Sequence, residues 1–101
     1  MNPTDEQLAV LACDITRRPK GAPSFDDVLP ALHDLRREAG ALVLDFDPAA
    51  RATVAALVDA ERRCCPDIGW DLRLDPAPRL RISAAPEQLD VFEGFLRQPA
   101  G

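Results

Sequence analysis

The sequence predicts an α+β fold, a two-layer sandwich in which helices cover one face of a small, mainly antiparallel sheet. Segments 68–75 and 79–83 alternate apolar and polar residues with the two-residue period of a strand, and segment 41–47 places Leu42, Leu44 and Phe46 on one side with the same period. Other segments repeat apolar residues at the three- and four-residue spacing of a helix. Strands that alternate in this way bury one face and expose the other, so the helices should lie on the buried face.

A first helix is expected over residues 5–17. Thr4 and Gln7 fit a capping box at its start, because the side chain of each can accept a hydrogen bond from the backbone N–H of the other. Apolar residues follow at helical spacing. A short strand over residues 11–15 is the alternative for this segment.

A second helix is expected over residues 28–39. Asp27 is a suitable N-cap, and Pro30 then falls in the first turn, where its missing N–H costs little. Apolar residues along the segment share one helical face. Gly40 follows directly and can end the helix, since glycine readily adopts the left-handed conformation of a C-terminal cap.

The strand over residues 41–47 leads into a third helix. Asp47 can cap this helix, with Pro48 at its first position, where proline is favoured. A stripe of apolar residues along the helix predicts a buried face, and Pro66 ends it.

A hairpin and a last helix complete the predicted fold. The hairpin strands, 68–75 and 79–83, present one apolar and one charged face. The last helix begins near Pro86. The strand–helix–strand step over residues 41–75 forms a right-handed crossover if its two strands are parallel.

Length and charge set limits on the class of protein. The chain has 101 residues, 47% of them hydrophobic, which suits a single domain over residues 1–101 whose ends, 1–4 and 98–101, can be flexible. A net charge of -5 argues against a nucleic-acid surface and against adhesion to anionic membranes. A homodimer or a protein partner is compatible with these properties.

The compartment is predicted from the N-terminus and the cysteines. Residues 1–6 lack the basic and apolar regions of a signal peptide, and no apolar run approaches the roughly 18 residues of a membrane span. Three cysteines, an odd number, also argue against a simple disulfide framework. We therefore expect a cytoplasmic protein, in a compartment where thiols stay reduced.

Two of the three cysteines are adjacent, in the segment ERRCCP at 61–66. On the predicted third helix, Glu61 shares a face with Cys64 and Cys65, which follow it by three and four residues. Pro66 disfavours helical backbone at Cys65, which can turn both sulfurs toward one pocket. The sequence therefore predicts a three-residue face formed by Glu61, Cys64 and Cys65 at the end of a helix.

This face predicts soft-metal binding. Thiolates prefer soft or borderline ions such as Cu(I), Zn(II) and, by extension, Hg(II), and a site of two or three thiolates would also suit arsenite. Adjacent cysteines depart from the spacing of closed zinc sites. The expected ligands are Cys64 and Cys65, with Cys13 as a third ligand and Glu61 or Asp67 as accessory groups. His33 is more often a solvated side chain than a ligand.

Other interpretations of the same residues stay open. Glu61 can serve the thiols as a ligand, base or acceptor, or it can pair with an arginine such as Arg73. Arg62 and Arg63 favour a thiolate, whereas the negative end of the helix dipole opposes it. The cysteines can instead exchange thiol and disulfide, if Cys13 comes within about 7 Å (Cα to Cα), or simply pack in the core. Overall the pattern favours a binding role over an enzymatic one.

The segment at 61–66 resembles the "ERxCCPF" signature of a group of small bacterial proteins. Residues 11–16, LACDIT, are similar to the "aCxLT" segment of this group, and residues 72–96 are similar to its closing "LxL…LxITGPEG…FL" run. Members of the group often lie beside mercury-responsive regulators or other heavy-metal resistance genes. The resemblance implies a heavy-metal role for Cys64 and Cys65, and it adds Cys13. Asp67 replaces the phenylalanine of the signature, and residues 83–88 lack the glycines of the group.

Overall fold

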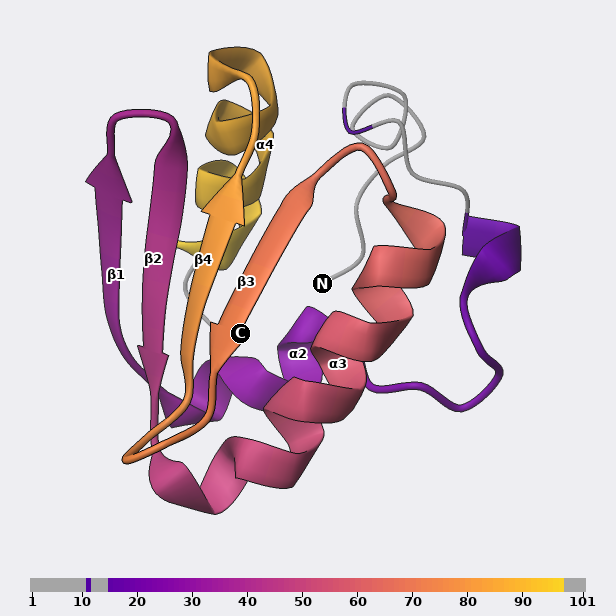
Figure 1. Ribbon diagram of the computed structural model, residues 1–101, viewed down its shortest axis with the longest axis vertical. Helices are drawn as coiled ribbons and strands as arrows, with labels where there is room; N and C mark the ends of the chain where they lie inside the picture. The colour runs from indigo at the N-terminus through magenta and orange to yellow at the C-terminus, as the bar shows by residue number, and fades with distance from the viewer. Residues whose placement is uncertain (1–10, 12–14, 98–101) are drawn as a thin grey trace.

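A computed structural model, which describes residues 11 and 15–97, contains one four-stranded antiparallel sheet in the order β1-β2-β4-β3 (Figure 1). The strands are β1 (Leu32–Glu38), β2 (Ala41–Phe46), β3 (Gly69–Arg73) and β4 (Arg79–Ser83). The α-helices are α2 (Phe25–Val28), α3 (Arg51–Cys64) and α4 (Pro86–Leu96), with 3-10 turns at Ile15–Arg17, Leu29–Ala31 and Pro48–Ala50. The predicted α+β class is confirmed.

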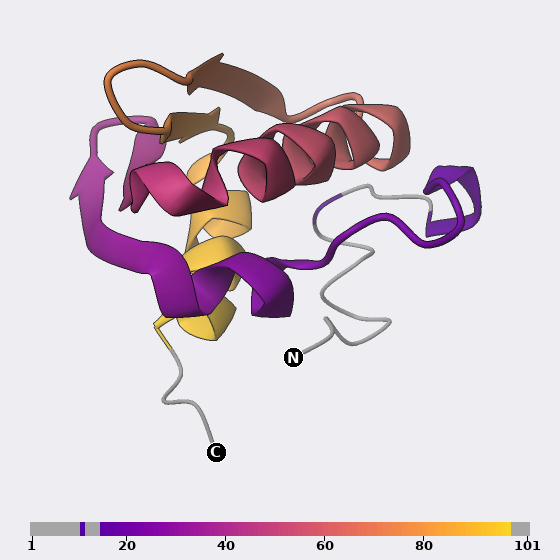
Figure 2. The ribbon, with the colours of Figure 1, turned by 90° about the horizontal axis from the view of Figure 1, so that it is seen from below.

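The core lies between the sheet and the helices, and α3 and α4 lie on the same side of the sheet (Figure 2). The sheet contributes the apolar halves of its alternating strands: Leu42, Leu44, Phe46, Trp70, Leu80 and Ile82. Each of the two long helices contributes an apolar stripe: Val54, Leu57 and Val58 from α3, and Leu89, Phe92, Phe95 and Leu96 from α4. The core therefore follows from two periodicities, two residues in strands and 3.6 in helices.

The opposite face of the sheet is charged, as the alternation predicts. Asp45 on β2 accepts hydrogen bonds from Arg36 on β1 and Arg79 on β4. Glu38 accepts one from Arg81 across the sheet. Ala41 and Val43 of β2 lie on the same face and are buried, so its charged side chains, apart from Asp45, stand on the strands beside them.

The predicted helix over residues 28–39 is wrong, because most of this segment is the edge strand β1. A bulge explains the misleading pattern. Leu32 pairs with Phe46, and Leu35 pairs with Leu44, so one extra residue lets both leucines face the core although they are three positions apart. Three-residue spacing is also the spacing of a helical face. Gly40, with φ +75, is the last residue of the tight β1–β2 turn and not a helix stop.

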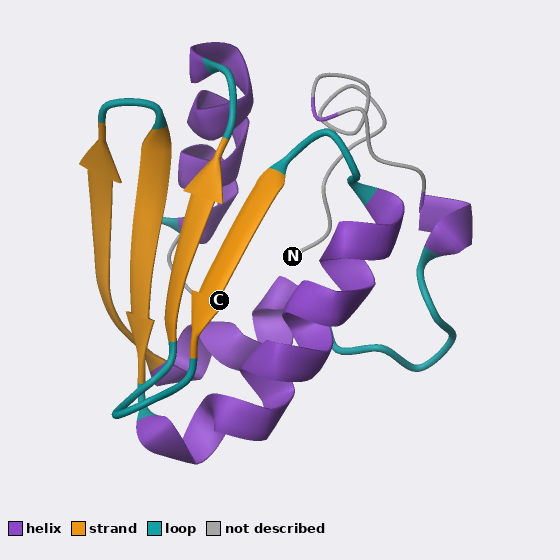
Figure 3. Ribbon diagram, in the orientation of Figure 1, coloured by secondary structure: helices purple, strands orange, loops and turns teal. Residues whose placement is uncertain are grey.

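The transition from β2 to α3 forms as predicted. The Asp47 side chain accepts a hydrogen bond from the backbone N–H of Ala49, and Pro48 opens the 3-10 turn that precedes α3. Both β2 and β3 pair antiparallel with β4, so they are parallel to each other with β4 between them. A short loop then joins α3 to β3 (Figure 3). The cysteine pair stands at the start of this loop.

The remaining elements agree with the prediction where the structure describes them. The hairpin β3–β4 and the helix α4, which begins at Pro86, are confirmed. Most of the predicted first helix, 5–10 and 12–14, lies outside the described residues, and Ile15–Arg17 form a 3-10 turn. Every helix in the described part of the chain is too short or too polar to cross a membrane.

Candidate functional site

The cysteine pair sits where α3 leaves the helical conformation. Cys64 is the last residue of α3, and Cys65 has φ −126 and ψ 67, which confirms that Pro66 excludes it from the helix. The Cys65 N–H still donates to the Glu61 carbonyl, which holds the two residues to the helix end. The two Sγ atoms are 3.4 Å apart, so both sulfurs turn toward one place.

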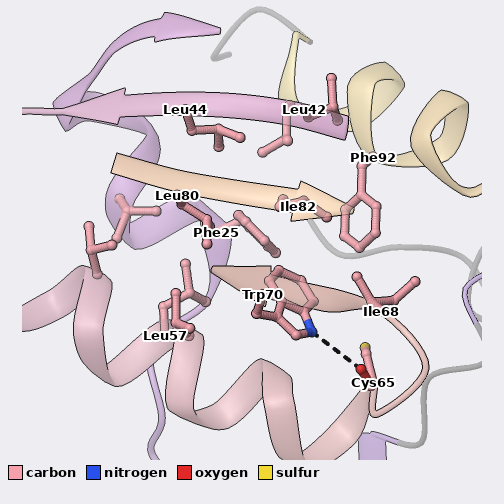
Figure 4. Packing of buried hydrophobic residues seen from close by; sticks show 14 of the residues in the cluster. Phe25, Leu42, Leu44, Leu57, Cys65, Ile68, Trp70, Leu80, Ile82 and Phe92 are labelled. Atoms are coloured by element: carbon pink, nitrogen blue, oxygen red, sulfur yellow. Dashed lines mark hydrogen bonds between the residues drawn. The ribbon is translucent and has the colours of Figure 1, made fainter. Parts of the chain in front are cut away.

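The backbone of Cys65 is fixed by hydrogen bonds that do not involve its sulfur. Its carbonyl oxygen accepts from the Ile68 N–H at 3.2 Å and from the Trp70 indole Nε1–H at 3.2 Å (Figure 4). Trp70 packs edge-to-face against Phe92, with ring centroids 5.7 Å apart. The position of the thiol pair is thus set by the hydrophobic core.

Glu61 is the only buried charged side chain among the described residues, with 7% of its surface exposed. Its Oε2 lies 3.6 Å from Cys64 Sγ and 3.7 Å from Cys65 Sγ. Its Oε1 accepts a hydrogen bond from Arg18 Nη1, and the two side chains form an ion pair. The predicted three-residue face is confirmed, but the arginine that pairs with Glu61 is Arg18 and not Arg73.

The two cysteines differ in chemical state. Cys64 is a free thiol, whereas Cys65 is disulfide-bonded. Because a disulfide sulfur carries no proton, Cys64 is the donor to Glu61, and Cys65 Sγ only contacts the carboxylate in this state. Cys13, the third predicted ligand, lies outside the described residues.

Burial sets the acidity of Cys64. The pKa of this thiol is raised from its ordinary value of 9.0 to about 11. Loss of solvent is the main cause, and the negative charge of Glu61 is the second. Arg18 acts in the opposite direction. The arginines next to the pair in sequence point elsewhere: Arg62 donates to the Trp70 carbonyl, and Arg63 pairs with Asp59. The structure thus gives the role predicted for Arg62 and Arg63 to Arg18.

We expect the stability of the protein to fall as the pH rises from about 9 to about 11. The pKa of Cys64 is higher in the folded chain, so the folded state keeps a proton that the unfolded chain releases in this window. The chain has no tyrosine and a single lysine, which leaves few other groups to titrate there. Urea unfolding at successive pH values measures the loss. A Cys64→Ala variant that loses stability with the same slope would contradict the expectation.

Asp67 and His33 do not join the cluster. Asp67 is exposed and is absent from the group of ligand atoms around the sulfurs. His33 lies 3.3 Å from the carboxylate of Asp47, which caps the 3-10 turn before α3, at the end of the helix away from the cysteines. Together α3 and its preceding turn are more than about 20 Å long, because 14 residues rise about 1.5 Å each. His33 is therefore not a ligand of this site.

The ligand atoms of Glu61, Cys64 and Cys65 lie within 4.8 Å of one another, and this cluster could hold a metal ion. Two sulfurs and one carboxylate oxygen form a mainly soft donor set, which favours thiophilic ions. Arg18 is the residue that the sequence did not indicate. It precedes Pro19 in a loop with no periodic pattern, and it reaches Glu61 across 43 positions.

Comparison with known proteins assigns no family to the chain. No protein-family model matches it, and neither the curated proteins nor the solved structures contain a match. A function is therefore inferred from the geometry around Glu61, Cys64 and Cys65.

Proposed function

We propose that the chain binds a soft metal or metalloid ion through the sulfurs of Cys64 and Cys65. The observation that carries this proposal is the convergence of two sulfurs, 3.4 Å apart, on a buried carboxylate. Thiols that only pack need no such partner, since free cysteine is accommodated in apolar cores. A buried carboxylate, in contrast, is costly unless it has a use or a partner.

Binding by both sulfurs requires the Cys65 disulfide to open first. A dithiol reductant would supply the two electrons and two protons, leaving two thiols on the protein and a disulfide on the reductant. The backbone hydrogen bonds of Cys65 are independent of its sulfur, so the pair is expected to stay in place after reduction.

Glu61 gives the reduced pair an acceptor for its protons. Metal cations bind thiolates, so each thiol must lose its proton when a cation enters. Glu61 Oε2 contacts both sulfurs, at 3.6 and 3.7 Å, and can take up a proton from either one. The resemblance to the ERxCCPF group extends the proposal to a heavy-metal ion such as Hg(II), with Cu(I) and Zn(II) as the other candidates, and to Cys13 as a third thiolate.

Calorimetric titration of the reduced protein with Hg(II), Cu(I) and Zn(II) tests this function. We expect one ion per chain, and a Cys64→Ser/Cys65→Ser variant should lose at least about a hundredfold in affinity, because even second-shell changes cost 10–100-fold. Asp67→Asn is the matched control, since Asp67 is exposed and outside the cluster. Unchanged affinity and stoichiometry in the double serine variant would rule out the site.

A thiol–disulfide redox protein is the second candidate, because Cys65 is disulfide-bonded beside the free thiol of Cys64. In that case the bond to Cys65 would be reduced by a dithiol and formed again on oxidation. Mass spectrometry after mild oxidation of the reduced chain distinguishes the two functions. If no disulfide forms between Cys13 and either Cys64 or Cys65, the protein is not a redox protein of this kind.

A further inference from the structure

The separation of the two sulfurs limits the ions that the pair can hold without rearrangement. At 3.4 Å, and with sulfur–ion bonds of about 2.3 Å, the sulfurs subtend an angle of about 95° at a bound ion. A tetrahedral ion would need sulfurs about 3.8 Å apart, and a linear two-coordinate ion would need about 4.6 Å. An angle slightly above a right angle is typical of pyramidal three-coordinate ions that carry a lone pair, such as trivalent arsenic or antimony.

Arg18 shows what could fill the third position of such an ion. Its Nη1 is paired with Glu61 Oε1. Its Nη2 is buried and has no hydrogen-bond partner among the described residues. A buried donor of a charged group without an acceptor is unfavourable. A bound ion that keeps one hydroxyl group would bring the missing acceptor to this guanidinium.

We propose that the reduced site takes a trivalent arsenic or antimony hydroxide, held by the Cys64 and Cys65 sulfurs, with its remaining hydroxyl group accepting a hydrogen bond from Arg18 Nη2. This inference rests on the proposed function, names the class of ion, and gives the third position to a hydroxyl group in place of the Cys13 thiolate. Unlike a metal cation, this class reaches the site as a neutral hydroxide. It therefore brings no extra charge into a buried site that already holds an ion pair.

The binding step is an exchange of ligands without electron transfer. Arsenous acid has three As–O bonds, of which two break as two As–S bonds form. The two thiol protons combine with the two leaving hydroxides to give water, and arsenic stays trivalent. Glu61 Oε2, in contact with both sulfurs, is placed to relay each proton from sulfur to the leaving oxygen.

Two probes test the hydroxyl contact: arsenite, and methylarsonous acid, in which a methyl group replaces the third hydroxyl. Trp70 is the only tryptophan and bonds Cys65, so its fluorescence should report binding of either probe. In the reduced chain we expect Arg18→Gln to weaken arsenite binding about tenfold relative to methylarsonous acid, the usual effect of one charged hydrogen bond. Any loss of stability in the variant lowers its apparent affinity for both probes equally. The ratio of the two affinities is therefore insensitive to stability.

Arg63→Gln is the matched control, because Arg63 is close in sequence to the pair but pairs with Asp59 in solvent. It should leave the ratio of the two affinities unchanged. X-ray absorption at the arsenic edge should show two sulfurs and one oxygen. Three sulfurs and no oxygen, or an Arg18→Gln ratio equal to that of the control, would overturn the role of Arg18.

Titration of the reduced chain with metal cations and with arsenite separates the class of ion from the soft-metal site itself. If the reduced chain binds Hg(II), Cu(I) or Zn(II) but not arsenite, the class of ion is wrong and the soft-metal site stands. If none of these ions binds, the proposed function itself is wrong, and the inference that rests on it is overturned as well.

Discussion

Replacing Trp70 with alanine is expected to lower the free energy of unfolding by about 4 kcal/mol, as the loss of a large buried aromatic side chain does. Trp70 lies on β3 with 8% of its surface exposed. Its ring contacts Phe25 and Phe92, and these three rings join the sheet to α2 and α4. Urea denaturation measures the change.

The same substitution should disturb the thiol pair, because the Trp70 indole N–H holds the Cys65 carbonyl. Under native conditions we expect faster alkylation of Cys64 in Trp70→Ala than in Leu57→Ala. Leu57 is a fully buried core residue of α3, and its loss should cost about 3 kcal/mol. Equal alkylation rates in the two variants at matched stability would show that Trp70 does not position the pair.

The parts of the fold that were predicted correctly are those with two agreeing local signals. Asp47 caps and Pro48 opens the turn before α3, and the apolar stripe of the helix then runs to Cys64. In β2, the two-residue spacing of Leu42, Leu44 and Phe46 indicated a strand and the face that it turns to the core. Local hydrogen bonding and burial point to the same structure at these positions, so the sequence alone was sufficient.

The segment that forms β1 was predicted as a helix because its two inward leucines have helical spacing. Both leucines face the core only because of the way β1 pairs with β2. The side chains of β1 are mostly exposed, so few core contacts leave a signal in the sequence. The bulge beside Leu32 then gives the two inward leucines helical spacing. Helix propensity is a weak signal, and pairing with β2 overrides it.

The site also combines residues that local spacing predicts with one residue that it does not predict. Glu61, Cys64 and Cys65 were predicted to converge because the two cysteines follow Glu61 by three and four positions at the end of one helix, where spacing determines proximity. Arg18 comes from a loop, and no periodicity relates it to α3. Its contact with Glu61 is fixed by the packing of the whole chain, which a local pattern does not encode.

Replacing Arg18 with leucine is expected to destabilise the protein by about 3 kcal/mol, because it leaves the Glu61 carboxylate buried without a counter-charge. Most of this free-energy cost comes from the uncompensated negative charge of Glu61, and less comes from the loss of its attraction to Arg18. Adding Glu61→Gln to Arg18→Leu should therefore recover much of the stability, since the second change removes that charge.

The control for this experiment is Arg63→Leu. Arg63 pairs with Asp59 one helical turn away, but both side chains are more than half exposed, so the change should cost less than about 0.5 kcal/mol. Chemical denaturation of Arg18→Leu, Glu61→Gln and the variant with both changes completes a double-mutant cycle. Arg63→Leu is measured beside them as the reference. If the two single changes and the double change simply add, Arg18 does not compensate the buried carboxylate, and another group must do so. Strong coupling would mean that the residues around the thiols are held by one buried ion pair, which any ion entering the site must either preserve or replace.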